Sequence, residues 1–256
     1  MTYSEETTRQ LENAAHLLQN SRKTVAFTGA GLSVPSGIPD FRSASTGLWN
    51  RFDPMEVASL TAFQRNPDAF FNWLEPLARD SLNAQPNLAH ISLARLQTAG
   101  FIQTLITQNI DSLHQKAGSF DVIELHGNLG SFICVTCQKH FSLLHYRDTW
   151  LNDHIFPSCP KCGSLLKPDI VLYEEMLPQD SWEQAEEACE ESELILIAGT
   201  SLEVMPASSL PLEGFHRGAK LVIINLSPTP LDTLAESVIT LDVAIALPEL
   251  ERQVLL

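Results

Sequence analysis

Two closely spaced glycines directly after a short apolar run constrain the fold of this chain more than any other feature. The run Val25-Ala26-Phe27 ends in Thr28-Gly29-Ala30-Gly31. A strand that turns sharply into Gly-x-Gly is typical of the first unit of an α/β sheet, where glycine lets the backbone approach a pyrophosphate closely. The sequence therefore predicts a phosphate-binding loop at Gly29, Ala30 and Gly31.

This loop departs from the fingerprint of nicotinamide-dependent oxidoreductases. The next glycine after Gly31 is Gly37 rather than the third residue on, and Pro35 and Pro39 interrupt the helix that should follow. The acidic residue that binds a ribose at the end of a nearby second strand is also missing. We therefore expect a bound dinucleotide that does not serve hydride transfer.

Further short aliphatic runs predict a doubly wound, Rossmann-like, mostly parallel sheet of the α/β class. Helical periodicity at 5–20, 87–99 and 182–191 separates several of these runs, as expected when helices cover such a sheet. The runs lie at 25–28, 101–107, 122–125, 194–198, 221–225 and 238–241.

Two segments do not fit this alternation and are interpreted as insertions. The segment 43–82 is rich in aromatic residues and predicts a helical module, while 128–167 contains four of the five cysteines. We expect the two insertions to form one smaller domain above the carboxyl edge of the sheet. The segments 1–42, 83–127 and 168–256 would then form the dinucleotide-binding domain, with a ligand cleft between the two lobes.

The four clustered cysteines predict a structural zinc site. Cys134-x-x-Cys137 and Cys159-x-x-Cys162 form two knuckles with 21 residues between them, which is close to the spacing of a four-cysteine zinc ribbon. Four thiolates complete the coordination sphere, so no position remains for a catalytic water. Two disulfides do not suit a cytoplasmic chain, and a redox Cys-x-x-Cys does not suit two matched pairs.

The charge balance is strongly acidic. The formal net charge is −15, from 16 Lys and Arg against 31 Asp and Glu, which argues against direct nucleic-acid binding. An acidic surface favours encounter with basic protein segments, or serves solubility alone. No apolar run is long enough to cross a bilayer, and residues 1–20 lack the pattern of a signal peptide, so we expect a cytoplasmic protein.

A series of segments across roughly residues 25–245 follows an order that points to a known family. They are Gly29–Ser33, Ser36–Arg42, Gly47–Trp49, Thr107–His114, Glu124–Gly127, the cysteine pairs, Lys167–Val171, Gly199–Val204 and Asn225. Together they resemble the sirtuins, the Sir2 family of NAD-dependent protein lysine deacylases. The resemblance implies that NAD is consumed as a co-substrate: the nicotinamide–ribose bond is cleaved and the acyl group passes from lysine to ADP-ribose.

The resemblance also implies roles at the reacting centre. His126 would be the base that activates a ribose hydroxyl, because an imidazole near its ordinary pKa can take and return a proton at pH 7. Gly127 would leave space for substrate beside it, and Gln108 would help position the imidazole. Asn109 and Asp111 would hold the nicotinamide ribose and carboxamide side, where amides offer both a donor and an acceptor.

Further cofactor contacts are implied in the same way. Phe41 would shield the reacting ribose, Arg42 would contact the phosphate or ribose region, Asn225 would bind the adenosine ribose, and Ala244 would lie near the adenine. The whole implied set besides His126 is Gly29, Ala30, Gly31, Asp40, Phe41, Arg42, Gln108, Asn109, Ile110, Asp111, Gly199, Thr200, Ser201, Asn225 and Ala244.

The expected substrate is an acylated lysine in a protein or peptide. Val171 and Tyr173 lie in a segment that in sirtuins pairs with the substrate backbone by adding a strand. Glu174 stands where the family usually has glycine, and its carboxylate would favour Lys- or Arg-flanked substrates. Leu74 and Leu77 match by spacing the Tyr-x-x-Arg pair of succinyl-selective sirtuins, so we expect acetyl or longer neutral acyl groups.

Three other functions remain as alternatives. Mono-ADP-ribosyltransfer to a protein would use the same NAD cleavage with a different acceptor. A non-catalytic NAD-sensing or zinc-ribbon binding module would need no base, which the combination of His126, Asn109 and Asp111 argues against. A conventional oxidoreductase is disfavoured by the glycine spacing.

Overall fold

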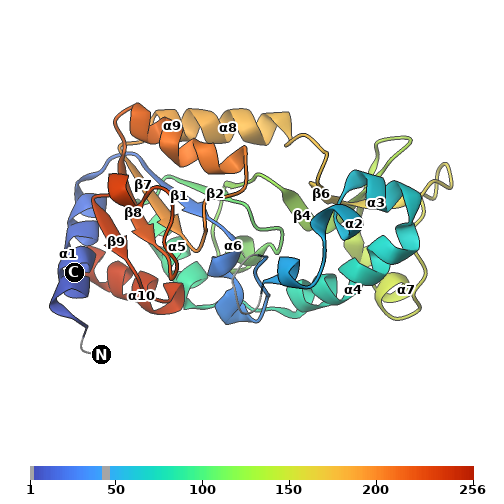
Figure 1. Cartoon of the computed structure of the whole chain (residues 1–256), viewed down its shortest axis with the longest axis horizontal. Coiled ribbons are helices and arrows are strands. Elements are labelled where there is room, and N and C mark those ends of the chain that lie inside the picture. The colour runs from blue at the N-terminus through green and yellow to red at the C-terminus, as the bar shows by residue number, and fades with distance from the viewer. Residues whose placement is uncertain (1–2, 42–46) are drawn as a thin grey trace.

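Six parallel strands form the larger lobe of the computed structural model, which describes residues 3–41 and 47–256 (Figure 1). The strands are paired in parallel register throughout, in the order β3-β2-β1-β7-β8-β9. Their bounds are β1 Thr24–Thr28, β2 Thr104–Thr107, β3 Val122–Glu124, β7 Leu194–Ala198, β8 Lys220–Ile224 and β9 Ser237–Ile239.

The strand order reverses between β1 and β7. From β1 the chain adds β2 and β3 on one side, and later adds β7, β8 and β9 on the other. Thr28 at the end of β1 pairs with Thr107 of β2 and with Ala198 of β7, so these three strands end at the same level. Ligands of doubly wound sheets bind at such a reversal, which places the candidate site just beyond Thr28.

Helices cover both faces of this sheet (Figure 1). Three helices pack against Ala26, Leu196 and Val222 on one face, and two pack against Phe27 and Ile197 on the other. Adjacent residues such as Ala26 and Phe27 enter opposite cores because side chains alternate along a strand. The first group is α1 Glu5–Asn20, α5 Leu88–Thr98 and α10 Val243–Val254, and the second is α8 Gln179–Glu190 and α9 Leu210–His216. Among the helices of the described residues, none is both long and apolar enough to cross a membrane.

The smaller lobe joins both predicted insertions around one core. Phe71 comes from the first insertion and Trp150 from the second, and their rings meet edge to face at 5.7 Å. Phe132 meets Trp150 in the same way at 5.6 Å. This lobe contains an antiparallel sheet in the order β5-β4-β6, with β4 Gly127–Cys134, β5 His140–Ser142 and β6 Leu166–Ile170. Its helices are α2 Pro54–Val57, α3 Leu60–Arg65, α4 Pro67–Asn83 and α7 Arg147–Leu151.

The predicted α/β class, with a doubly wound sheet and a smaller cysteine-bearing module, is confirmed. The second strand was expected from residue 101 and begins at Thr104. The predicted end of the second insertion at 167 falls inside β6, which runs to Ile170. The division of the chain into the two domains stays a prediction.

Candidate functional site

Loops from the carboxyl ends of the parallel strands gather at one edge of the six-stranded sheet. These loops contain most of the cofactor residues predicted from the sequence: Gly29–Gly31 after β1, Gln108–Asp111 after β2, His126 after β3, Gly199–Ser201 after β7 and Asn225 after β8. Ala244 lies in the first turn of α10, after β9. The fold therefore brings together residues that are more than 200 positions apart in sequence.

The two glycine-containing loops touch each other at the point where strand order reverses. The amide of Gly31 donates to the carbonyl of Gly199 at 2.8 Å, and the amide of Gly29 donates to Ala198 at 3.3 Å. A Cβ on Gly31 would lie 2.9 Å from the Gly199 oxygen, and one on Gly29 would lie 2.7 Å from Cβ of Thr200. Sequence reasoning explained these glycines by approach to a pyrophosphate. The structure adds a second reason, which is the approach of one loop to the other.

Asn109 and Asp111 are both 8% exposed and are held by a hydroxyl between them. Asn109 Nδ2 donates to the Gly29 carbonyl at 3.0 Å and to Ser33 Oγ at 3.2 Å. Ser33 Oγ in turn donates to Asp111 Oδ2 at 2.6 Å, and the amide of Leu113 donates to Asp111 Oδ1 at 2.8 Å. The predicted pair is thus tied to the first glycine loop through Ser33, a residue that we had not assigned to the site.

Two buried histidines lie beneath this network and were not predicted. The ring centroids of His90 and His114 are 5.1 Å apart, and Nε2 of His114 lies 2.9 Å from Thr28 Oγ1. Burial lowers the pKa of His90 to about 4, against an opposing effect of the Asp111 carboxylate. Burial also lowers the pKa of His114 well below its ordinary value. Both imidazoles are therefore neutral at pH 7. His90 lies in a predicted helix and His114 in one of the sequence motifs, but no feature of the sequence indicated that the two side chains would be in contact.

His126 is held at the edge of the site by a main-chain carbonyl. Its Nδ1 lies 2.9 Å from the Gln108 oxygen. A carbonyl oxygen can only accept a hydrogen bond, so Nδ1 carries the proton and the lone pair of the neutral ring lies on Nε2. Gln108 thus contacts His126 through its backbone carbonyl, and its role in positioning the imidazole stays a prediction. The Gln108 side chain instead donates to Thr200 Oγ1 at 3.1 Å.

Position 127 needs glycine for a reason other than the expected one. Its φ is 69°, and a Cβ would overlap the carbonyl oxygen of Asp169 in β6. The space beside Gly127 is filled by the neighbouring strand rather than left for substrate. Glycine is required here because β4 and β6 approach closely, and this contact lies next to His126.

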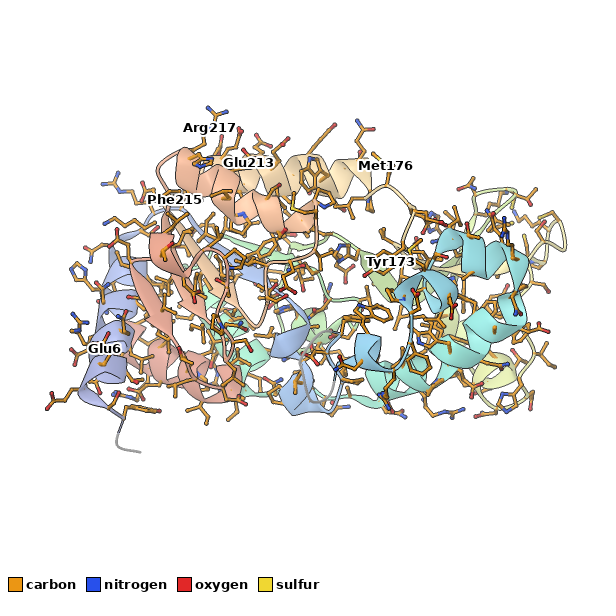
Figure 2. The ribbon with its side chains drawn as sticks, viewed as in Figure 1. Glu6, Tyr173, Met176, Glu213, Phe215 and Arg217 are labelled. Carbon is orange, nitrogen blue, oxygen red and sulfur yellow. The ribbon has the colours of Figure 1, made fainter. Side chains whose placement is uncertain are left out.

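Aromatic rings connect the loop after β1 with the small lobe. Phe41 stacks on Trp49 with centroids 5.1 Å apart, and Trp49 stacks on Trp73 of α4 at 6.1 Å. Trp49 also meets Tyr173 edge to face at 6.1 Å. Tyr173 lies on the side of the small lobe that faces the larger one (Figure 2). The predicted cofactor loop and the predicted peptide segment therefore share one aromatic cluster.

The remaining predicted residues are placed as follows. The carbonyl of Asp40 accepts from the amide of Leu48 at 3.0 Å, and Arg42 lies outside the described residues. Asn225 Nδ2 donates to its own turn, at the Ser227 carbonyl, at 2.7 Å. Ile110 packs against the small-lobe core that contains Leu74, whereas Leu77 is only half buried. Ser201 is half buried beside Thr200 in the loop after β7.

The predicted peptide segment is fixed to the loop that contains His126. The amide of Val171 donates to the His126 carbonyl at 2.9 Å. Lys167 Nζ lies 2.8 Å from Glu175 Oε2, and these side chains are only 10% and 21% exposed. The same carboxylate oxygen accepts the amide of Leu172 at 2.8 Å. An ion pair with little water around it, reinforced by main-chain bonds, thus defines the shape of this segment.

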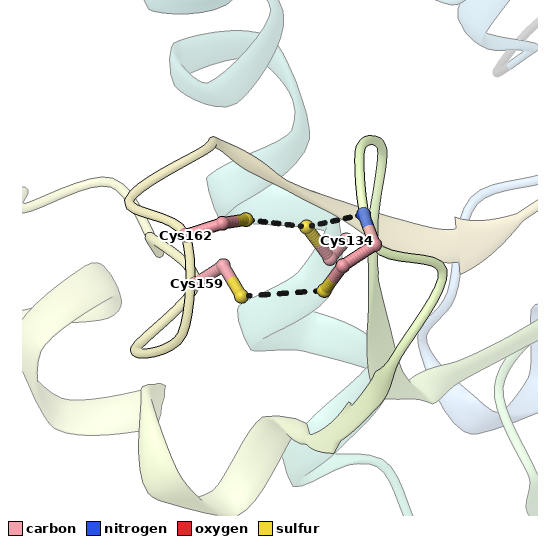
Figure 3. Close-up of side chains that lie close together, drawn as sticks. Cys134, Cys159 and Cys162 are labelled. Carbon is pink, nitrogen blue, oxygen red and sulfur yellow. Dashed lines mark hydrogen bonds between the residues drawn. The ribbon is translucent and has the colours of Figure 1, made fainter.

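Four cysteines converge at the far end of the small sheet (Figure 3). Their sulfur atoms all lie within 4.8 Å of one another, with Cys134 and Cys162 at 3.5 Å and Cys137 and Cys159 at 3.7 Å. A tetrahedral zinc site with Zn–S bonds near 2.3 Å needs sulfur pairs about 3.8 Å apart. The amide of Cys137 donates to the Cys134 sulfur at 3.4 Å and lowers the pKa of that thiol. The donor set and its spacing fit zinc.

The family model described as the Sir2 family matches residues 29–206 of the chain, which include the glycine loops, His126 and the cysteines. The chain is a Sir2-family protein. It is 42% identical to the NAD-dependent protein deacetylase of Saccharolobus solfataricus over 243 residues, which covers 95% of this chain and 96% of that protein.

Solved Sir2 structures share the whole fold of this sirtuin. One Sir2 enzyme structure superposes with a TM-score of 0.90 at 39% identity, covering 96% of this chain and 98% of the other. A Sir2 structure with a p53 peptide and NAD+ superposes with a TM-score of 0.81 at 41% identity, covering 94% and 95%. The resemblance found in the sequence motifs therefore extends over both lobes.

Proposed function

We propose that this sirtuin is an NAD-dependent protein lysine deacylase that transfers the acyl group of a modified lysine to ADP-ribose. The related Saccharolobus solfataricus protein carries the name NAD-dependent protein deacetylase. The observation that carries the proposal is the placement of His126. Its Nδ1 is hydrogen-bonded to the Gln108 carbonyl, and its own carbonyl accepts a hydrogen bond from the Val171 amide. A proton acceptor thus lies between the predicted cofactor loops and the predicted peptide segment.

Different residues of the chain would have different roles in such a reaction. NAD, when bound, supplies the nicotinamide–ribose bond that is broken and the ribose that receives the acyl group. Asn109 and Asp111 are preorganised by Ser33 to orient a ribose or amide, so little reorganisation is needed on binding. His126 accepts a proton at Nε2, since Nδ1 is committed to the Gln108 carbonyl.

Burial supports these roles energetically. Asn109 and Asp111 are almost fully covered, so their hydrogen bonds act in a medium of lower dielectric constant than water. The rings of Phe41, Trp49 and Tyr173 lie at the border between the lobes and would exclude water from the reacting centre. The glycines at 29, 31 and 199 keep the loops close enough together to form one floor for a pyrophosphate.

We further propose that zinc is structural here. Cys134, Cys137, Cys159 and Cys162 supply four thiolate ligands, so the metal would have no open position for a reactant. Cys134 and Cys159 are buried in the small-lobe core, which links metal binding to the folding of that lobe.

The substrate proposal is an acylated lysine in an extended peptide that pairs beside Val171 and Tyr173. Apolar Leu74 on α4 supports neutral acyl groups over dicarboxylic ones, because a carboxylate without a cationic partner is costly to bury. A cytoplasmic location and lack of direct nucleic-acid or membrane binding remain predictions from composition. Preference for basic flanks remains a prediction from Glu174.

The decisive experiment is mass spectrometry of acetyl- and succinyl-lysine peptides incubated with the protein, with and without NAD. We expect NAD-dependent loss of the acetyl group with release of nicotinamide and O-acetyl-ADP-ribose, and slower loss of succinyl. His126→Ala should abolish turnover, whereas His16→Ala, at an exposed position on α1, should not. ADP-ribose attached to protein would indicate a transferase. Intact NAD with every peptide would indicate a binding module.

A further inference from the structure

Glu174 adopts a backbone conformation that is unusual for its residue type. Its φ is 76°, in the left-handed region that favours glycine. In the family that the motifs resemble, glycine is the usual residue at this point of the segment. A glutamate there needs a compensating interaction, because the left-handed region disfavours a residue with a Cβ.

That interaction is with the start of a helix from the other insertion. Oε2 of Glu174 accepts a hydrogen bond from the amide of Thr61 at 2.8 Å, in the first turn of α3. This amide is the main reason why the pKa of Glu174 lies below its ordinary value, and the charge of Arg65 adds to the effect. A carboxylate at a helix N-terminus is favourable because it satisfies a backbone donor and faces the positive end of the helix dipole.

The segment that contains Glu174 accepts hydrogen bonds from two backbone amides in the first turn of α3. The amide of Leu60 donates to the Tyr173 carbonyl at 3.0 Å, whereas the amide of Ala62 is bonded locally, to Ser59 Oγ at 2.9 Å. In the opposite direction, the amide of Tyr173 donates at 3.0 Å to the carbonyl of Ala58, the C-cap residue of α2. The peptide segment therefore caps the start of α3 and is itself held by the end of α2.

We propose that Glu174 is a positioning residue that fastens the peptide-pairing edge Val171–Tyr173 to α3 and so sets the affinity for the acylated peptide. The proposal rests on the proposed function, in which this edge receives the substrate backbone. Without the carboxylate, the segment would lose its hydrogen bond to the Thr61 amide, and part of the binding energy of a peptide would be used to order the edge.

This assignment differs from the expectation that Glu174 selects basic flanking residues, which stays a prediction. The carboxylate is directed at Thr61 rather than left for a substrate side chain. The fastening needs an oxygen acceptor at the end of the side chain, whereas charge selection needs a negative charge. A glutamine separates the two, because its amide oxygen reaches as far and accepts from Thr61 without a charge.

The test compares Glu174→Gln, Glu174→Gly and a control, Glu213→Gln, which removes the same charge from α9 far from Tyr173 (Figure 2). Peptide Kd is measured by fluorescence polarisation with acetyl-lysine peptides that have basic or acidic flanks. Peptide and NAD KM are measured in parallel. Glu174→Gly relieves the positive φ, so the variant should fold, and its urea midpoint verifies this.

We expect Glu174→Gly to weaken peptide binding about 3- to 10-fold, because only part of the stabilisation from a hydrogen bond to a charged group is passed on to the peptide edge, with NAD KM unchanged. Glu174→Gln should stay within about twofold of the parent, and neither variant should alter the ratio of basic to acidic peptides by more than Glu213→Gln does. Unchanged peptide affinity in Glu174→Gly would overturn the proposal. So would an equal loss in both variants together with loss of basic preference. Because Kd needs no turnover, failure of the deacylase assay in the parent protein remains distinguishable from failure of this proposal.

Discussion

Replacing Gly199 by alanine will force apart the two loops that meet where the strand order reverses. Gly199 has φ +64°, and a Cβ there would overlap the amide nitrogen of Leu32 and lie 2.8 Å from the carbonyl carbon of Gly31. The left-handed backbone alone costs an alanine about 1–2 kcal/mol. Loss of the 2.8 Å bond from Gly31 to Gly199 adds about 1 kcal/mol. We therefore expect a loss of about 2–3 kcal/mol in the free energy of unfolding.

Urea unfolding and NAD kinetics measure the two consequences. Gly100→Ala is the matched control, because Gly100 has φ +84° but no atom lies within 4 Å of the position of its Cβ. In the control, the free energy of unfolding should fall only by the cost of the left-handed backbone, about 1–2 kcal/mol, and the KM for NAD should not change. Gly199→Ala should lose more stability and show a raised KM for NAD, since the displaced loop contains the predicted phosphate contacts. Equal stability losses in the two variants with an unchanged KM for NAD would refute the reasoning.

Two further outcomes follow from the small lobe and the buried histidines. Elemental analysis should find one zinc per chain, and Cys159→Ser or chelation should lower the melting temperature; a fully stable, zinc-free chain would contradict this. Because burial lowers the pKa of His90 to about 4, the unfolded chain binds more protons between pH 6.5 and 4, so stability falls as pH drops through that window. The free energy of unfolding, measured in urea, should fall about 1 kcal/mol less between pH 7 and 5.5 in His90→Gln than in the parent protein. The same pH dependence in both proteins would exclude a role for His90.

Sequence reasoning predicted the six-stranded sheet because its central strands, such as β1 and β7, are buried on both faces. Runs such as Leu194–Ala198 are therefore continuously apolar and easy to find. The strands of the small lobe lack that signal. In β4, Gly127–Cys134, exposed and buried residues mix, and the strand contains two glycines and an asparagine. Helix α10 was missed as well, and Pro248 inside it is a residue that normally argues against a helix.

The candidate site was predicted where it depends on loops at strand ends and missed where it depends on packing. Asn109 and His126 follow strands and could be named from the sequence. The contact of His114 with Thr28 joins residues 86 positions apart, and no local pattern records such a meeting. The direction of the Glu174 carboxylate was unpredictable for the same reason, because Thr61 is 113 positions away.

The hydrogen bond between the Val171 amide and the His126 carbonyl fixes the proposed peptide edge relative to the residue that carries the imidazole. Neighbouring residues of an extended peptide point to opposite sides, so a shift in pairing by one residue turns the acyl-lysine away from the imidazole. If the proposed edge binds the substrate, a misaligned peptide would be bound but not converted. Errors in peptide alignment should then lower turnover more than they weaken binding.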